Sequence, residues 1–174
     1  MSRLKPPVGA ADHIQGPRDA PVTLVEFGDF ECSYCGEAYP QLKAVQAALG
    51  ERMCFVFRNF PLSNAHPHAL LAAGFAEAAA TLGRFWEMHD LLFEHQDALE
   101  ADDLVGYARS LGLSQALIAA ALRGDYAQKV QQDFSSGVRS GVNGTPCIFI
   151  NGARWEGPAT DAALVPALKR LAPG

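Results

Sequence analysis

Short hydrophobic runs alternate with helix-like spacing in the first third of this chain. The runs at residues 21–27 and 53–60 are rich in Val and Phe, as expected of strands that are buried on both faces of a sheet. Between them, apolar residues recur every three or four positions up to Gly50, which predicts a helix that ends there. Because strand, helix, strand crossovers are right-handed, the two strands should be parallel. The pattern therefore predicts an α/β fold.

The middle of the chain, from about residue 66 to 138, has helical spacing and little else. We expect five helical segments there, the first with Pro67 at its first helical position, where proline is well tolerated. The segments are rich in Ala but are not copies of one another, which argues against a solenoid. They are expected to form an all-helical insertion.

Strand signals return near the end of the chain. Residues 147–150 are apolar, and Asn151 followed by Gly152 favours a two-residue hairpin turn into a returning strand. Thr160 is expected to cap a last helix, which Pro166 should kink or delay.

Composition narrows the function classes. The chain has 174 residues, of which 49% are hydrophobic, so it can bury a substantial core. Its formal charge is −5, and acidic and basic residues are interspersed, without the basic stripe of a nucleic-acid-binding protein. No apolar run approaches the length that spans a membrane. We therefore expect neither nucleic acid as a partner nor insertion into a membrane.

The first residues bear on the cellular compartment. Arg3 and Lys5 are followed by prolines, glycines and charged residues, not by the apolar segment of a secretory signal. If Met1 is the natural start, we expect a cytoplasmic protein. A periplasmic or secreted location is the alternative if a signal peptide has been removed.

Cys32 and Cys35 form a C-x-x-C pair between the first predicted strand and the first predicted helix. Such a pair can bind a metal, staple a turn or exchange electrons. A closed zinc site needs two more ligands, and Cys54 and Cys147 are solitary, so we expect no metal. A structural disulfide across so short a loop would stabilise the fold little. At a helix N-terminus, an exposed Cys32 would gain a stabilised thiolate, which favours redox chemistry.

The order of these elements resembles the thioredoxin fold of the DsbA-like thiol-disulfide oxidoreductase family. The resemblance covers nearly the whole chain. It rests on five motifs, which are Cys32-Ser33-Tyr34-Cys35, FRNFPL at 57–62, RFWEMHDLLF at 84–93, Gly144-Thr145-Pro146 and FING at 149–152. It implies a mixed central sheet built from residues 1–64 and 139–174, with a helical insertion at 65–138.

The resemblance also implies an activity. The protein would exchange disulfides with protein or peptide substrates and with an unidentified redox partner, needing no cofactor because its own dithiol carries two electrons. Cys32 is the expected nucleophile, and Cys35 would resolve the mixed disulfide. Glu26 corresponds to the buried acid that exchanges protons with Cys35. A solvated glutamate without a role is the alternative.

Four residues are expected to contact the substrate. Pro146 would be a cis-proline facing the thiols, and Thr145 would offer its backbone to an extended peptide. A trans proline at the start of a strand is the alternative. Ser33 and Tyr34 stand where some relatives carry Pro-His. Without that histidine, the thiolate should depend mainly on the helix N-terminus, and the protein should be a weaker oxidant.

Cys54 and Cys147 lie on strands that should flank the central strand, about 10 Å apart, which is too far for a disulfide. Cys54 is expected to be a small buried hydrophobic residue. Cys147 follows the expected cis-proline, so core packing and a redox role both stay open. A different class of function is also possible, namely a non-catalytic peptide-binding module whose cysteines form a redox-sensitive clasp.

Overall fold

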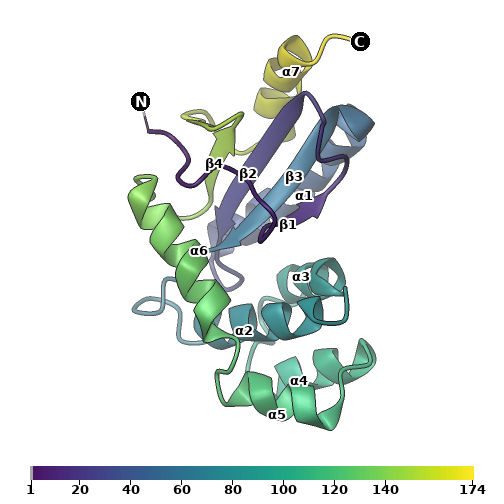
Figure 1. Cartoon of the computed structure of the whole chain (residues 1–174), viewed down its shortest axis with the longest axis vertical. Helices are drawn as coiled ribbons and strands as arrows, with labels where there is room; N and C mark the ends of the chain where they lie inside the picture. The colour runs from purple at the N-terminus through teal and green to yellow at the C-terminus, as the bar shows by residue number, and fades with distance from the viewer. Residues whose placement is uncertain (1) are drawn as a thin grey trace.

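The computed structural model describes residues 2–174, and within that range it contains one mixed sheet with helices on both faces (Figure 1). The strand order is β1-β3-β2-β4-β5, with β2 and β3 parallel and the other neighbours antiparallel. The strands are β1 (His13–Gln15), β2 (Val22–Gly28), β3 (Met53–Asn59), β4 (Cys147–Ile150) and β5 (Ala153–Arg154). The parallel pair and the C-terminal hairpin are as predicted, whereas β1 was not foreseen.

One face of the sheet is covered by α1 (Ser33–Leu49) and α7 (Asp161–Leu171). Alternate residues of β2, starting with Val22 and Leu24, point toward these helices, as the period of two along a strand requires. The Thr160 side chain accepts a hydrogen bond from the backbone N–H of Ala163, which confirms the predicted cap of α7. Pro166 lies inside that helix.

The other face is covered by α6 (Ala127–Arg139) and by the N-terminal segment. Gly137 permits this close packing, because a Cβ there would lie 2.6 Å from the Phe60 ring and 3.1 Å from the Phe27 ring. Phe60 stacks on Phe134 of α6, with 4.3 Å between ring centroids. In Figure 1, α6 runs along the sheet from the helical end of the molecule.

The remaining helices lie together beyond the ends of β2 and β3 that lead into α1 and α2 (Figure 1). They are α2 (Ala69–Ala80), α3 (Phe85–Glu94), α4 (Ala101–Ser110) and α5 (Gln115–Leu122). With α6, they make the five helices that the sequence predicts between β3 and β4. The prediction for Pro67 is wrong, because α2 begins at Ala69 and Pro67 lies in the turn before it. No helix in residues 2–174 is both long and apolar enough to cross a membrane.

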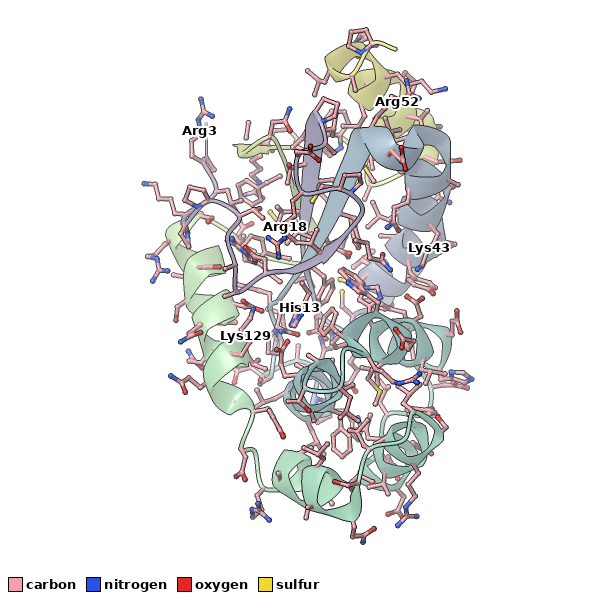
Figure 2. The ribbon with its side chains drawn as sticks, turned by 45° about the vertical axis from the view of Figure 1, so that its right-hand side comes forward. Arg3, His13, Arg18, Lys43, Arg52 and Lys129 are labelled. Atoms are coloured by element: carbon pink, nitrogen blue, oxygen red, sulfur yellow. The ribbon has the colours of Figure 1, made fainter. Side chains whose placement is uncertain are left out.

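Polar contacts join the helical part to the sheet and to α1. Lys43 of α1 donates to Asp90 of α3 at 3.0 Å, and His13 of β1 lies 2.9 Å from a carboxylate oxygen of Glu77 on α2. Figure 2 labels Lys43 on α1 and His13 on β1, on the side of the molecule where the helices approach the sheet. The contacts fix the helices against the end of the sheet that carries the C-x-x-C motif.

Candidate active site

The C-x-x-C motif lies where β2 has ended and α1 begins. Cys32 is the N-cap of α1, with an extended backbone (φ −71°, ψ 122°), and its carbonyl accepts the N–H of Gly36 at 3.0 Å. An N-cap side chain lies near the unpaired N–H groups of the first turn. The Cys32 sulfur therefore has the position in which a helix N-terminus favours a thiolate.

The surroundings of Cys32 favour its ionised form. A hydrogen bond from the Cys35 thiol lowers the pKa of Cys32 from 9.0 to about 5, helped by Thr145 and by the backbone N–H groups of Cys35 and Tyr34, while burial acts against them. The Thr145 hydroxyl is buried and has no partner among residues 2–174, so it is free to donate to the sulfur. The Cys35 thiol is the largest single cause of the lowered pKa, and each of the two backbone N–H groups at the start of α1 contributes less.

Cys32 is also less accessible than the sequence suggests. Only 4% of its surface is exposed, because it belongs to the same buried cluster as Phe30 and Phe57. When protonated, its sulfur donates to the Thr145 carbonyl at 3.6 Å. Access of a partner disulfide to the Cys32 sulfur is therefore limited in this structure.

Cys35 and Glu26 form the buried half of the site. Cys35 is fully buried, and its pKa is raised first by burial, then by its hydrogen bond to Cys32 and by the charge of Glu26. Glu26 of β2 is 2% exposed, and its Oε1 has no hydrogen-bond partner in the described part of the chain. Burial, and next the negative charge of Cys32, raise the pKa of Glu26 from 4.5 to about 8. An acid that titrates near neutral pH thus lies within electrostatic reach of the thiol that has to lose a proton.

Gln96, which sequence reasoning missed, holds the start of α1 in place. It lies just after α3, and its Nε2 donates to the carbonyls of Phe30 and Cys32, both at 2.9 Å. Gly36 makes this approach possible, because any side chain there would collide with the Gln96 carboxamide. No motif marks Gln96, since the contact joins residues far apart in the sequence.

A groove of about 470 Å³ opens next to the motif between α1, β4, β5 and the start of α7. The Thr145–Pro146 peptide bond at its edge is cis. Tyr34 is 68% exposed and lines the groove, whereas Ser33 is exposed at the start of α1 and lies outside the groove lining described in residues 2–174. Polar and aromatic side chains dominate the lining, among them Tyr34, Glu37, Gln41, Thr145, Arg154 and Trp155.

Cys54 and Cys147 belong to the core on the other face of the sheet, although Cys147, which follows Pro146, also borders the groove. Their partners on β2 are Thr23 and Phe27. The two thiols are therefore separated by two strand spacings of about 5 Å each and by about 13 Å along the strands. All four thiols of the described chain are free, and no group of three or more His, Cys, Asp and Glu side chains in residues 2–174 is arranged to hold a metal ion.

Comparisons with known proteins place the chain in a family. The sequence model of a family described as thioredoxin matches residues 10–170. The chain is also 46% identical over 160 residues to the Na(+)/H(+) antiporter NhaA 3 of Salinispora tropica, a match that covers 90% of this chain and 24% of that protein. The chain spans about a quarter of the length of the curated relatives it matches.

Solved structures share the fold at low sequence identity. BdbD from Bacillus subtilis, in its oxidised form, matches with a TM-score of 0.82 at 24% identity and 92% coverage of both chains. Wolbachia pipientis alpha-DsbA1 matches with a TM-score of 0.81 at 18% identity, covering 97% of this chain and 94% of its own. These matches confirm the predicted thioredoxin fold with a helical insertion. The chain belongs to the thioredoxin family and has the DsbA-like form of its fold.

Proposed function

We propose that the chain is a thiol-disulfide oxidoreductase that exchanges disulfides with protein or peptide substrates through Cys32 and Cys35. The observation that carries the proposal is that the pKa values of two adjacent thiols are shifted in opposite directions. The pKa of Cys32 is lowered to about 5, chiefly by the Cys35 thiol, whereas burial raises that of Cys35. At neutral pH one thiol is thus ready to attack, and the other stays protonated until it is needed.

The reaction proceeds in two exchanges. The Cys32 thiolate attacks a sulfur of the substrate disulfide, so that a mixed disulfide forms and the other substrate sulfur leaves as a thiolate. Cys35 then attacks the Cys32 sulfur, which forms the Cys32–Cys35 disulfide and releases the second substrate sulfur. Two electrons pass from the dithiol to the substrate, and the reverse sequence oxidises a substrate dithiol. The direction is set by the reduction potential of the pair relative to its compartment and partner.

Glu26 serves the second exchange as the proton acceptor of Cys35. Part of its raised pKa comes from repulsion by the Cys32 thiolate. That repulsion disappears once Cys32 is joined to a substrate, so the pKa of Glu26 falls. More of the Glu26 carboxyl group is then deprotonated and able to accept the proton of Cys35. Its unpartnered Oε1 leaves an oxygen free to take the proton. No bound cofactor is required by these steps.

The groove beside Thr145 and Pro146 is the proposed binding site for substrate. An extended peptide next to Cys32 can pair with the backbone at Thr145, which is strand addition limited to a few bonds. The exposed Tyr34 supplies an aromatic surface, while Arg154 and Glu37 offer charges of both signs. This mixed lining suits polypeptides of varied sequence better than one small ligand.

Catalytic turnover tests the proposal. Reduction of insulin disulfides, with a small thiol to regenerate the dithiol, should proceed through many cycles with the wild-type chain. It should fall to the rate of the small thiol alone with Cys32→Ser, because the attacking sulfur is gone. A wild-type protein that matches the Cys32→Ser background would overturn the oxidoreductase proposal.

A second candidate function is a non-catalytic module in which the cysteines act as a redox-sensitive clasp on a bound peptide. It is favoured by the curated relatives, which are sodium-proton antiporters about four times the length of this chain. The clasp allows at most one exchange for each molecule in the insulin assay. The cytoplasmic expectation gains no support from these partial matches.

A further inference from the structure

His66 lies in the segment between β3 and α2, and its imidazole is directed at the loop that precedes Cys32. Its Nδ1 is 2.7 Å from Oδ2 of Asp29, whose side chain has no exposed surface, while one quarter of the His66 side chain is exposed. Asp29 stands immediately after β2 and three residues before Cys32. A histidine from a distant part of the sequence thus reaches the loop of residues 29–32, which we call the redox loop, through one buried carboxylate.

Asp29 connects His66 to the backbone that positions Cys32. Its carbonyl accepts the N–H of Cys32 at 3.2 Å, and its Oδ1 accepts the N–H of Glu31 at 2.8 Å. Its Oδ2 also accepts the N–H of Leu62 at 2.8 Å, so the same oxygen ties the His66 segment to the loop. A fixed link therefore joins the His66 ring to the residue that carries the reactive sulfur.

We propose that His66, held by Asp29, is a positioning residue that supplies positive charge near the Cys32 thiolate. His66 then loses its proton more readily once the dithiol is oxidised. The inference rests on the proposed function and extends it to a residue outside the C-x-x-C motif. Ser33 and Tyr34 carry no cation between the two cysteines. The His66–Asp29 pair provides one from the helical part of the molecule.

The charges around His66 agree with this role. Its pKa is raised first by the hydrogen bond to Asp29, and then by the charges of Asp29, Cys32 and Glu31, while burial acts in the opposite direction. Glu31 is itself paired with His68, whose Nδ1 lies 2.8 Å from Oε1. Of these negative groups, Cys32 is the one whose charge changes during the reaction.

The coupling follows from charge balance in the two exchanges. When the Cys32 thiolate forms its bond to a substrate sulfur, the negative charge moves to the departing substrate thiolate, and Cys32 becomes neutral. It stays neutral in the Cys32–Cys35 disulfide. Linkage is reciprocal. The free energy by which the thiolate stabilises protonated His66 therefore equals the free energy by which protonated His66 stabilises the thiolate.

Three variants of the full chain test the inference. His66→Gln keeps a hydrogen-bond donor for Asp29 but removes the charge, His66→Lys keeps the charge, and His68→Gln alters the neighbouring histidine that pairs with Glu31. The pKa of Cys32 in each reduced protein is read from thiolate absorbance. An opposite charge lowers the pKa of an acid by about 1–3 units when it lies within about 4–6 Å, and partial exposure weakens the effect, so His66→Gln should raise the pKa of Cys32 by less than about one unit.

His66→Lys should keep most of the lowered pKa of Cys32, and His68→Gln should leave it nearly unchanged. Equal rises in His66→Gln and His66→Lys would mean that His66 merely anchors its loop, and an unshifted His66→Gln would overturn the proposal outright.

The reciprocal effect is measured by nuclear magnetic resonance of the wild-type imidazoles in both redox states. The pKa of His66 should be higher in the reduced protein than in the oxidised one, by about the shift that His66→Gln causes at Cys32. Identical titration of His66 in both states would contradict the proposal. Both measurements are made without substrate, so a protein that fails to turn over insulin can still pass or fail them.

Discussion

Two cysteines lie on the α1 side of the sheet and two on its α6 side, and the environments of the two pairs differ. On the α1 side, Cys32 and Cys35 lie close together, with Glu26 and the Thr145 loop near them. On the α6 side, Cys54 and Cys147 are separated and packed among apolar side chains. All four are buried free thiols within the described chain. The difference in chemistry between the two pairs therefore has to come from their neighbours.

The comparison separates burial from activation. Burial raises the pKa of Cys54 and of Cys147, as it does for any thiol that leaves water. Burial acts in the same sense at Cys32, but donors from Cys35, Thr145 and the first turn of α1 outweigh it. A reactive thiol thus needs hydrogen-bond donors to its ionised form, and within residues 2–174 these lie on the α1 side of the sheet.

The largest expected effect separates the two members of the active pair. Cys32→Ser should abolish both capture of substrate and turnover, because Cys35 is fully buried and its pKa is raised by burial. Cys35→Ser should still form mixed disulfides through Cys32 but fail to resolve them, so covalent complexes accumulate on a non-reducing gel. Complexes with Cys32→Ser in place of Cys35→Ser would reverse the two roles. Two folded variants that trap nothing would favour the clasp.

Glu26→Gln should have the next largest effect, confined to the second exchange. Loss of a positioned base should slow resolution of a mixed disulfide by on the order of a hundredfold, since general acid-base catalysis contributes about that much or more. Alkylation of Cys32 by iodoacetamide should change little, because burial keeps Glu26 largely protonated at neutral pH, with a pKa of about 8. Stopped-flow rates of the two steps decide the matter. Equal slowing of both would assign Glu26 a structural role.

Glu26 also predicts how stability depends on pH. Burial raises its pKa from 4.5 to about 8, so the folded protein holds a proton that the unfolded chain has lost, and this contribution to stability falls as pH rises from 4.5 to 8. Glu26→Gln removes the contribution, so its free energy of unfolding relative to wild type should increase with pH across that window. Urea unfolding of both reduced proteins measures the difference. A difference independent of pH would contradict the raised pKa.

Cys32 should act in the opposite sense. Its pKa falls from 9.0 to about 5 on folding, chiefly through the Cys35 thiol, so it adds stability that grows from pH 5 to 9 and is lost as pH falls through 5. The oxidised protein has no Cys32 thiolate and provides the control, because this rise should be absent from it. A rise of equal size in both redox states would place its origin elsewhere.

The smallest effects on chemistry are expected on the α6 side of the sheet. Cys54→Ser should keep turnover but lose about 1–3 kcal/mol of stability, since a hydroxyl is then buried among apolar groups. Cys147→Ser should keep kcat, and any change should appear in KM because Cys147 borders the substrate groove. A large fall in kcat for folded Cys147→Ser would move that thiol into the active site and end the contrast between the two faces.

Local patterns in the sequence were sufficient for most of the fold. The Val- and Phe-rich runs of β2 and β3, the Asn151-Gly152 turn and the Thr160 cap each depend on neighbouring residues. By contrast, β1 could not be foreseen, because its three residues are held by pairing with β3 and not by their own propensity. Pro67 was misplaced because its turn is fixed by contacts around His66 and His68 with the redox loop.

The same distinction between local sequence patterns and contacts of distant segments applies to the site. The C-x-x-C spacing and the helix-start pattern pointed to Cys32 and Cys35, and the resemblance to a known family pointed to Glu26 and Pro146. Gln96 and His66 could not be found in this way, because each reaches the redox loop from the helical insertion through a contact between distant segments. The near-complete burial of Cys32 was missed for the same reason.

The most direct test of the contrast between the two faces is alkylation of all four thiols in the reduced wild-type protein as a function of pH, with mass spectrometry to assign each site. Cys32 should react first, with a midpoint near its pKa of about 5, which the Cys35 thiol lowers. Cys35, Cys54 and Cys147 should stay largely unmodified up to pH 9. Reaction of Cys32 with an ordinary midpoint near 9, or at the same rate as Cys54 and Cys147, would contradict the account.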